Sequence, residues 1–286
     1  MTTHTHKTAP TQFVEANGIR FGYRRFGSAG GVPLVFNQHF TGTMDNWDPA
    51  VTNGLARGRE VILFNNAGVA NSSGEVPTTF QGMGANAIAF IKALGLTKAD
   101  VLGFSIGGFV AQEIALQAPD LVRRLVLVGT GPRGGQGMGT LTPEAQQIFS
   151  ATYDPPDHLW LAVHFTPSAA SQAAGREFLK RLRLRSKDRD PEVNERVAPA
   201  QIEAIGKWGA PQKSFDYLKA IKQPTLVVNG SKDVIIYTIN SFILQQNLPN
   251  AQLILYPDAS HGSQYQYPER FVGHTSLFLS EDDGHG

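Results

Sequence analysis

Short apolar segments recur along the chain without a polar residue at every second position. They end at Gly, Asn or Pro and span residues 33–36, 61–64, 101–104, 122–128, 225–228 and 253–256. Mostly apolar runs of this length are typical of strands that are covered on both faces, as in a parallel sheet.

Between several of these segments, apolar residues recur three or four positions apart, a spacing that predicts amphipathic helices. They are Phe80, Met83, Ala87, Phe90, Ile91 and Leu94, then Ile106, Val110 and Ile114, and finally Phe271 and Phe278. The alternation of strands and helices predicts βαβ units and an α/β fold. Near the start, residues 12–16 and 19–25 flank Asn17-Gly18, a strong hairpin signal, so the sheet should begin with an antiparallel pair.

The strand pattern stops between residues 141 and 211. Helical segments are predicted there instead, over residues 144–151, 157–165, 168–185 and 191–208. An insertion of this length is usually a lid or a disordered segment, and its apolar residues favour a folded one. We therefore predict a helical cap, 141–211, inserted into a core domain made of 1–140 and 212–286. The tail, 280–286, is expected to be a frayed end.

Composition narrows the functional classes. The 286 residues include 25 Lys and Arg against 24 Asp and Glu, a net charge of +1, which is too balanced for a nucleic-acid-binding protein. The basic run 180–189 is therefore expected to be a solvated helix face. The absence of cysteine excludes disulfides, a cysteine nucleophile and thiolate zinc sites. With no apolar leader and no apolar run of about 18 residues, we expect a cytoplasmic protein without membrane contact.

The most informative motif is Gly103-Phe-Ser105-Ile-Gly107, which directly follows a predicted strand and directly precedes a predicted helix. Glycines two positions either side of Ser105 permit a sharp strand-to-helix turn that presents its hydroxyl as a nucleophile. The alternative is that Ser105 only caps the helix.

A serine nucleophile needs a base and an acid that orients the base. Asp233 and His261 each follow a predicted strand, so both should emerge at the same edge of a parallel sheet as Ser105. The order Ser105, Asp233, His261 is the one described for α/β-hydrolases. Asp258 is nearer to His261 in sequence, but its position in the same loop suits a turn residue better.

With these motifs, the chain resembles the α/β-hydrolase superfamily over nearly its whole length, and is most similar to small capped bacterial esterases and cofactor-free haloperoxidases. The resemblance rests on the hairpin start, GFSIG, the helical insertion after the strand ending near Val128, and the segments DASHG and YPERF. It implies a mostly parallel eight-stranded sheet with flanking helices and a helical cap. Related dehalogenases and epoxide hydrolases attack with Asp, so Ser105 favours acyl chemistry.

The resemblance also implies an oxyanion hole formed by the backbone N–H groups of Ile106 and Phe40. Gln38-His39 replaces the His-Gly that usually begins the second of these turns. His39 either contacts substrate or only hydrogen-bonds across its loop, and Phe40 and Trp160 are the other candidate substrate contacts. The aromatic residues of the cap either line a pocket or pack its core; they are Trp160, Phe165, Phe178 and Trp208.

We therefore expect a serine hydrolase that cleaves a small apolar or aromatic ester, thioester or lactone. The chemistry needs neither metal nor cofactor, and His158 and His164 fall on different helix faces, which argues against a metal pair. The alternatives are a perhydrolase or haloperoxidase, a C–C bond hydrolase, and a ligand-binding or signalling protein with a vestigial or single-turnover triad. The expected partner is a small-molecule substrate, with no nucleic acid, and the chain is expected to be a monomer or homodimer.

Overall fold

The computed structural model describes residues 4–281. Of the predicted frayed tail, 280–286, only residues 280 and 281 are among them, and the rest of that prediction lies outside the described residues. One sheet has the strand order β1-β2-β4-β3-β5-β6-β7-β8. The strands are β1 (Gln12–Ala16), β2 (Ile19–Gly27), β3 (Leu34–Asn37), β4 (Glu60–Phe64), β5 (Ala99–Phe104), β6 (Val122–Val128), β7 (Thr225–Gly230) and β8 (Ala251–Tyr256). β2 pairs antiparallel with β1 and β4, and all other pairs are parallel. The predicted α/β fold with a mixed, mostly parallel sheet is confirmed.

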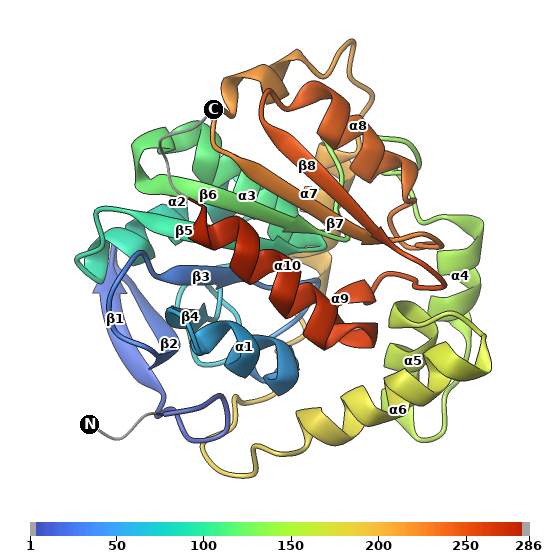
Figure 1. Cartoon of the computed structure of the whole chain (residues 1–286), viewed down its shortest axis with the longest axis horizontal. Coiled ribbons are helices and arrows are strands. Elements are labelled where there is room, and N and C mark those ends of the chain that lie inside the picture. Colours follow the sequence, from blue (N-terminus) through green and yellow to red (C-terminus); the bar gives the residue numbers. More distant parts are fainter. Residues whose placement is uncertain (1–3, 282–286) are drawn as a thin grey trace.

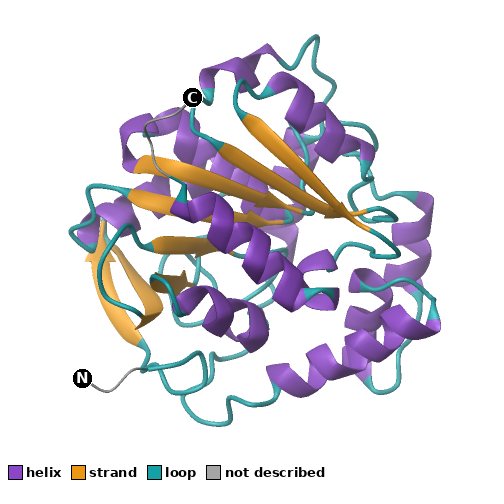
Figure 2. Cartoon of the chain, in the orientation of Figure 1, coloured by secondary structure: helices purple, strands orange, loops and turns teal. Residues whose placement is uncertain are grey.

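Helices cover both faces of this sheet, as Figures 1 and 2 show. The helices outside the β6–β7 connection are α1 (Pro49–Ala56), α2 (Phe80–Ala93), α3 (Ile106–Gln117), α8 (Ile239–Asn247), α9 (Ser263–Gln266) and α10 (Pro268–Ser280). α1 and α10 pack together on one face, and α2 and α3 pack together on the other. Within residues 4–281, no helix combines the length and apolar character needed to cross a membrane.

The central strands bury alternate residues in two different cores, which explains their uninterrupted apolar runs. In β3, Val35 belongs to the core beneath α2 and α3, whereas Leu34 and Phe36 belong to the core beneath α1 and α10. All three are fully buried. A strand with apolar neighbours on both faces needs no polar alternation.

The predicted hairpin is also present. Asn17 and Gly18 join β1 to β2 with φ values of +50° and +76°. Positive φ at both central residues is what a tight two-residue turn requires if its twist is to match the flanking strands.

Between β6 and β7 the chain forms a helical insertion, α4 (Pro143–Ser150), α5 (Leu159–His164), α6 (Ala169–Leu182) and α7 (Val197–Trp208). α4, α5 and α6 lie beyond the end of the sheet at which β7 and β8 terminate (Figure 1). The prediction of a helix from residue 191 is wrong, because α7 begins at Val197. The preceding segment is held in an irregular conformation by a buried ionic network, in which the backbone N–H of Asp190 donates to Asp45 Oδ2 at 2.7 Å.

The expectation that the basic run 180–189 is a solvated face is wrong for two of its arginines. Arg185 is buried, and its guanidinium donates to the backbone oxygens of His6, Lys7 and Asp188. Arg181 forms a forked ion pair with Asp48, whose side chain is fully buried. Both arginines therefore tie the helical insertion to the rest of the chain.

Candidate active site

Ser105 lies in a strained turn between β5 and α3. Its backbone has φ +57° and ψ −124°, a conformation that a non-glycine residue adopts only when its surroundings impose it. The Ser105 N–H donates to Val128 O at 2.9 Å, and Thr130 Oγ1 donates to Ser105 O at 2.8 Å. The Ser105 side chain makes no capping hydrogen bond to α3, so the alternative of a simple helix cap does not hold.

The two motif glycines are required by close backbone packing. A Cβ on Gly103 would lie 2.1 Å from Gly107 O, and a Cβ on Gly107 would lie 2.1 Å from Asn37 O. Real Cβ atoms do not approach backbone oxygens this closely. The second contact brings the end of β3 against the first turn of α3, so the turn after β3 lies beside Ser105.

His261 and Asp233, which are 28 residues apart in sequence, form a buried hydrogen-bonded pair at the carboxyl ends of β7 and β8. His261 Nδ1 lies 2.9 Å from Asp233 Oδ2. Asp233 Oδ1 accepts from the N–H groups of Ile235 and Ile236, at 2.9 and 3.1 Å, which orients the carboxylate. A carboxylate can only accept, so Nδ1 carries the proton and Nε2 of neutral His261 presents a lone pair.

The His261 loop lies against the Ser105 turn. The ring of His261 is 5.0 Å from the ring of Phe104, the residue before Ser105. Gly129 follows Val128, whose carbonyl oxygen accepts from the Ser105 N–H. A Cβ added at Gly129 would lie 3.1 Å from His261 O. Among residues 4–281, no hydrogen bond joins the Ser105 hydroxyl to His261, and such contacts are often long in enzymes without bound substrate.

In the turn after β3, three of the four backbone N–H groups of residues 39–42 have an acceptor, and that of Phe40 has none among the described residues. The His39 N–H donates to Gln38 Oε1, the Thr41 N–H to Gln201 Oε1, and the Gly42 N–H to His39 O. In the part of the chain that the structure describes, the Phe40 and Ile106 N–H groups have no intramolecular acceptor. The Gln38 side chain, absent from the usual form of this turn, also donates to Thr43 O at 2.6 Å and so holds the turn together.

The helical insertion is hydrogen-bonded to the loop that carries His261. The Gly262 N–H donates to His164 O at 2.9 Å. Asp258 accepts from Thr166 Oγ1 at 2.9 Å and from Ser168 Oγ at 2.5 Å. Asp258 therefore binds the insertion, in a turn with φ +48°, and not His261.

Two further histidines lie beside His261. The His164 ring stacks on Trp160, with centroids 5.4 Å apart, and lies parallel to the His261 ring at 6.0 Å. The centroid of the His39 ring lies 5.3 Å from that of Trp160 and 5.9 Å from that of His164. Burial lowers the pKa of His39 to about 4 and holds the pKa of His164 well below 6.5, so both imidazoles are neutral near pH 7.

The position of His164 at this site is not predicted from the sequence. The sequence feature that points to His164 is its place at the end of the apolar run Leu159-Trp-Leu-Ala-Val-His164. A histidine in such a run cannot be distinguished, from sequence alone, from one that only packs in a core. Of the other predicted cap aromatics, Phe165 and Phe178 pack within the buried core, and Trp208 stacks on Phe109 at 4.9 Å, away from His39 and His164.

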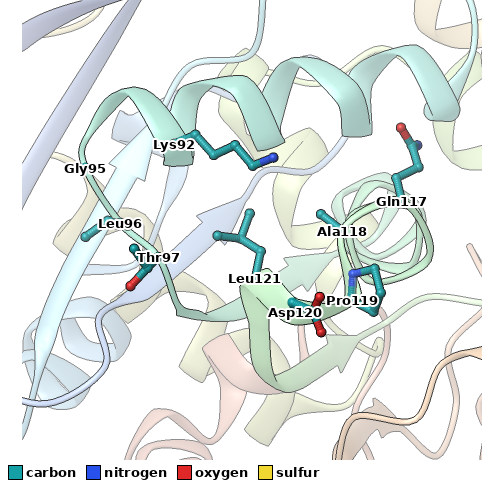
Figure 3. Close-up of a pocket in the computed structure, with 9 residues that line it drawn as sticks. All are labelled: Lys92, Gly95, Leu96, Thr97, Gln117, Ala118, Pro119, Asp120 and Leu121. Carbon is teal, nitrogen blue, oxygen red and sulfur yellow. The ribbon is translucent and has the colours of Figure 1, made fainter.

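A surface depression of about 600 Å³ lies elsewhere, before the starts of β5 and β6 (Figure 3). Parallel strands place it at the opposite end of the sheet from Ser105. Its charged side chains are Lys92 and Asp120, and it contains no histidine, so it offers no paired nucleophile and base. Across residues 4–281, no group of three or more His, Asp or Glu side chains is placed to hold a metal ion.

The comparisons with known proteins agree with the fold. The family model for the alpha/beta hydrolase fold matches residues 32–268, so the chain belongs to this family and is a hydrolase. A solved alpha/beta hydrolase fold protein from Chitinophaga pinensis is 44% identical, with a TM-score of 0.92 over 98% of this chain and 100% of that one.

Two curated relatives differ in their named activities. A 2-hydroxymuconate semialdehyde hydrolase of Pseudomonas putida is 30% identical, over 69% of this chain and 68% of the relative. A pimeloyl-acyl-carrier-protein methyl ester esterase of Nitrosomonas europaea is 31% identical, over 60% of this chain and 68% of the relative.

Proposed function

We propose that the protein is a serine hydrolase in which Ser105 is the nucleophile, His261 the general base and Asp233 the acid that orients His261. The observation that carries the proposal is the buried 2.9 Å contact between His261 Nδ1 and Asp233 Oδ2 beside the strained Ser105 turn. It fixes the His261 tautomer that can accept a proton, and Asp233 stabilises the imidazolium that forms.

The reaction proceeds in two acyl transfers. Ser105 Oγ attacks the substrate carbonyl as its proton passes to His261 Nε2, and His261 then returns this proton to the leaving alcohol, thiol or ring oxygen. Water next gives a proton to His261, attacks the acyl-enzyme and releases the acid, and Ser105 recovers its proton. The free N–H groups of Phe40 and Ile106 are suited to hold the oxyanion, and the latter also lies at the positive end of α3.

Residues 141–211 act as the cap in this proposal, and residues 1–140 and 212–286 form the core domain. The aromatic surroundings of His39 and Trp160, together with the neutral imidazoles, favour a small apolar or aromatic ester, thioester or lactone over a polyanion. We include His39, Phe40 and Trp160 among the residues that contact substrate.

The test is reaction with a fluorophosphonate probe and hydrolysis of p-nitrophenyl esters by the wild type and the Ser105→Ala variant. We expect labelling and ester hydrolysis in the wild type, and loss of both in the variant with an unchanged circular dichroism spectrum. Hydrolysis that persists in folded Ser105→Ala would overturn the proposal.

A second candidate reaction is carbon–carbon bond hydrolysis, which is favoured by the 30% identity to a 2-hydroxymuconate semialdehyde hydrolase. The same preparation should be assayed with 2-hydroxymuconate semialdehyde and, for perhydrolysis, with acetate and hydrogen peroxide. A kcat/KM for the semialdehyde above that for every ester would make C–C cleavage the principal activity.

A further inference from the structure

His39 has a single accessible tautomer. Its Nδ1 lies 2.9 Å from Phe40 O, and a carbonyl oxygen can only accept, so Nδ1 must carry the proton. Because burial keeps His39 neutral near pH 7, Nε2 has a lone pair and no proton. No hydrogen bond among the described residues uses this nitrogen. His39 therefore offers a hydrogen-bond acceptor.

His164 offers a second unpaired nitrogen. The residue is 2% exposed, and its buried Nδ1 has no hydrogen-bond partner among the described residues. An unmade hydrogen bond of this kind destabilises the folded state, and such atoms are uncommon in folded proteins. Leucine or phenylalanine would pack among Trp160, Phe178 and Tyr265 without that cost. The imidazole at this position therefore suggests a polar ligand.

The two imidazoles lie next to the proposed reaction centre. The His39 ring is 5.6 Å from Phe104, the residue before Ser105, and His39 directly precedes the proposed oxyanion donor Phe40. The His164 ring lies parallel to that of His261. A group bound between His39 and His164 would thus lie within a few bonds of the scissile carbonyl.

The chemistry of the pair selects the ligand group. The His39 nitrogen requires a donor, and two neutral imidazoles among aromatic rings offer no charge to an anion. The ring centroids are 5.9 Å apart, a spacing at which one oxygen can reach a nitrogen of each ring at about 2.9 Å. A hydroxyl satisfies both rings, because it donates to His39 and accepts from the N–H of His164.

We propose that His39 and His164 together bind a hydroxyl group on the acyl part of the substrate, on the first or second carbon beyond the scissile carbonyl. The proposal rests on the proposed function and narrows its substrate class to hydroxyacyl esters, thioesters or lactones. His39 and His164 are specificity-determining residues in this proposal.

The test compares p-nitrophenyl butyrate with its 2-hydroxy and 3-hydroxy derivatives and with the matching methoxy compounds, which lack the donor. Active enzyme is counted by fluorophosphonate titration. For the wild type we expect kcat/KM for one hydroxy ester to exceed that for its methoxy partner by about tenfold or more, the effect of one net hydrogen bond.

The variants His164→Phe and His39→Phe keep an aromatic ring and remove the nitrogens. We expect the hydroxy-to-methoxy ratio to fall towards one in each, whatever the absolute rate. His158→Phe is the matched control, because His158 lies in the same insertion outside the His39–His164–Trp160 cluster, and it should keep the wild-type ratio. His164→Phe leaves the Phe40 turn intact, so the test stands even if His39→Phe does not fold.

A wild-type ratio near one for both pairs, or a ratio unchanged in both variants, would overturn the hydroxyl proposal and leave the serine hydrolase intact. If Ser105 is neither labelled nor needed for hydrolysis, the proposed function fails, and the substrate class fails with it.

Discussion

The ion pair between Arg181 and Asp48 should be a major attachment of the helical insertion. Arg181 Nε lies 2.9 Å from Asp48 Oδ1, and Nη2 lies 2.7 Å from Oδ2. The Asp48 side chain is 0% exposed and that of Arg181 25%. Asp48 Oδ1 also accepts from the Ala50 N–H at 2.8 Å as the N-cap of α1.

Among the described residues, Arg181→Ala leaves the buried Asp48 carboxylate with one hydrogen bond, the N-cap bond from the Ala50 N–H. Breaking a buried pair in this way costs about 3–5 kcal/mol. Since Arg181 is partly exposed and the N-cap bond remains, we expect a loss of about 3 kcal/mol in the free energy of unfolding. Arg181→Lys should restore only part of it, because an ammonium cannot form the fork.

Arg183→Ala is the matched control two residues away. Arg183 pairs with Asp157, but the two side chains are 64% and 32% exposed, and surface pairs contribute about 0–1 kcal/mol. Urea denaturation, followed by tryptophan fluorescence and circular dichroism, measures both variants. If Arg181→Ala lies within about 0.5 kcal/mol of Arg183→Ala, the reasoning from burial is refuted.

Three further predictions concern Asp233, the glycines of the Ser105 turn and the buried histidines. Asp233→Asn should lower kcat by a factor of about 10⁴, as in serine-protease triads, whereas Asp258→Asn should lower it less than about tenfold. Steady-state kinetics with one ester measures both variants, and equal losses would count against Asp233. Gly107→Ala should lower the free energy of unfolding, measured by urea denaturation, by about 3 kcal/mol, because the added Cβ clashes with Asn37 O. Gly206→Ala, with nothing within 4 Å of its added Cβ, should instead raise it by about 0.5–1 kcal/mol by stabilising α7. Similar effects of the two variants would contradict the packing argument. Burial also lowers the pKa of three histidines below 6.5: His6 to about 3, His39 to about 4, and His164. The unfolded chain therefore binds more protons than the folded one below about pH 6.5, and the free energy of unfolding should fall from pH 7.5 to pH 5. In His164→Phe the slope of this free energy against pH should be smaller, by the equivalent of up to about one bound proton, and an unchanged slope would oppose a neutral buried His164.

Much of the fold could be predicted because it is encoded locally. Asn17-Gly18 specifies its turn through two positive φ values, and Gly103 and Gly107 specify the backbone packing around Ser105. The meeting of Asp233 and His261 also follows from sequence, since the carboxyl ends of neighbouring parallel strands lie at one edge of a sheet.

The rest depends on contacts between distant segments. The start of α7 was misplaced because Asp190 is held by Asp45, 145 residues earlier. Arg181 and Arg185 look like surface residues until their partners are known. His164 reaches His261 only through the packing of α5 on the loop after β8, which no spacing within the insertion encodes.

The most direct test of the central claim is to trap the acyl-enzyme. The protein should be quenched with acid during turnover of p-nitrophenyl acetate, digested, and the acetylated peptide located by mass spectrometry. We predict one acetyl group, on Ser105, and no acetylated peptide from the Ser105→Ala variant. Acetate release without acetylation of Ser105, or with the acetyl group on another side chain, would contradict the account.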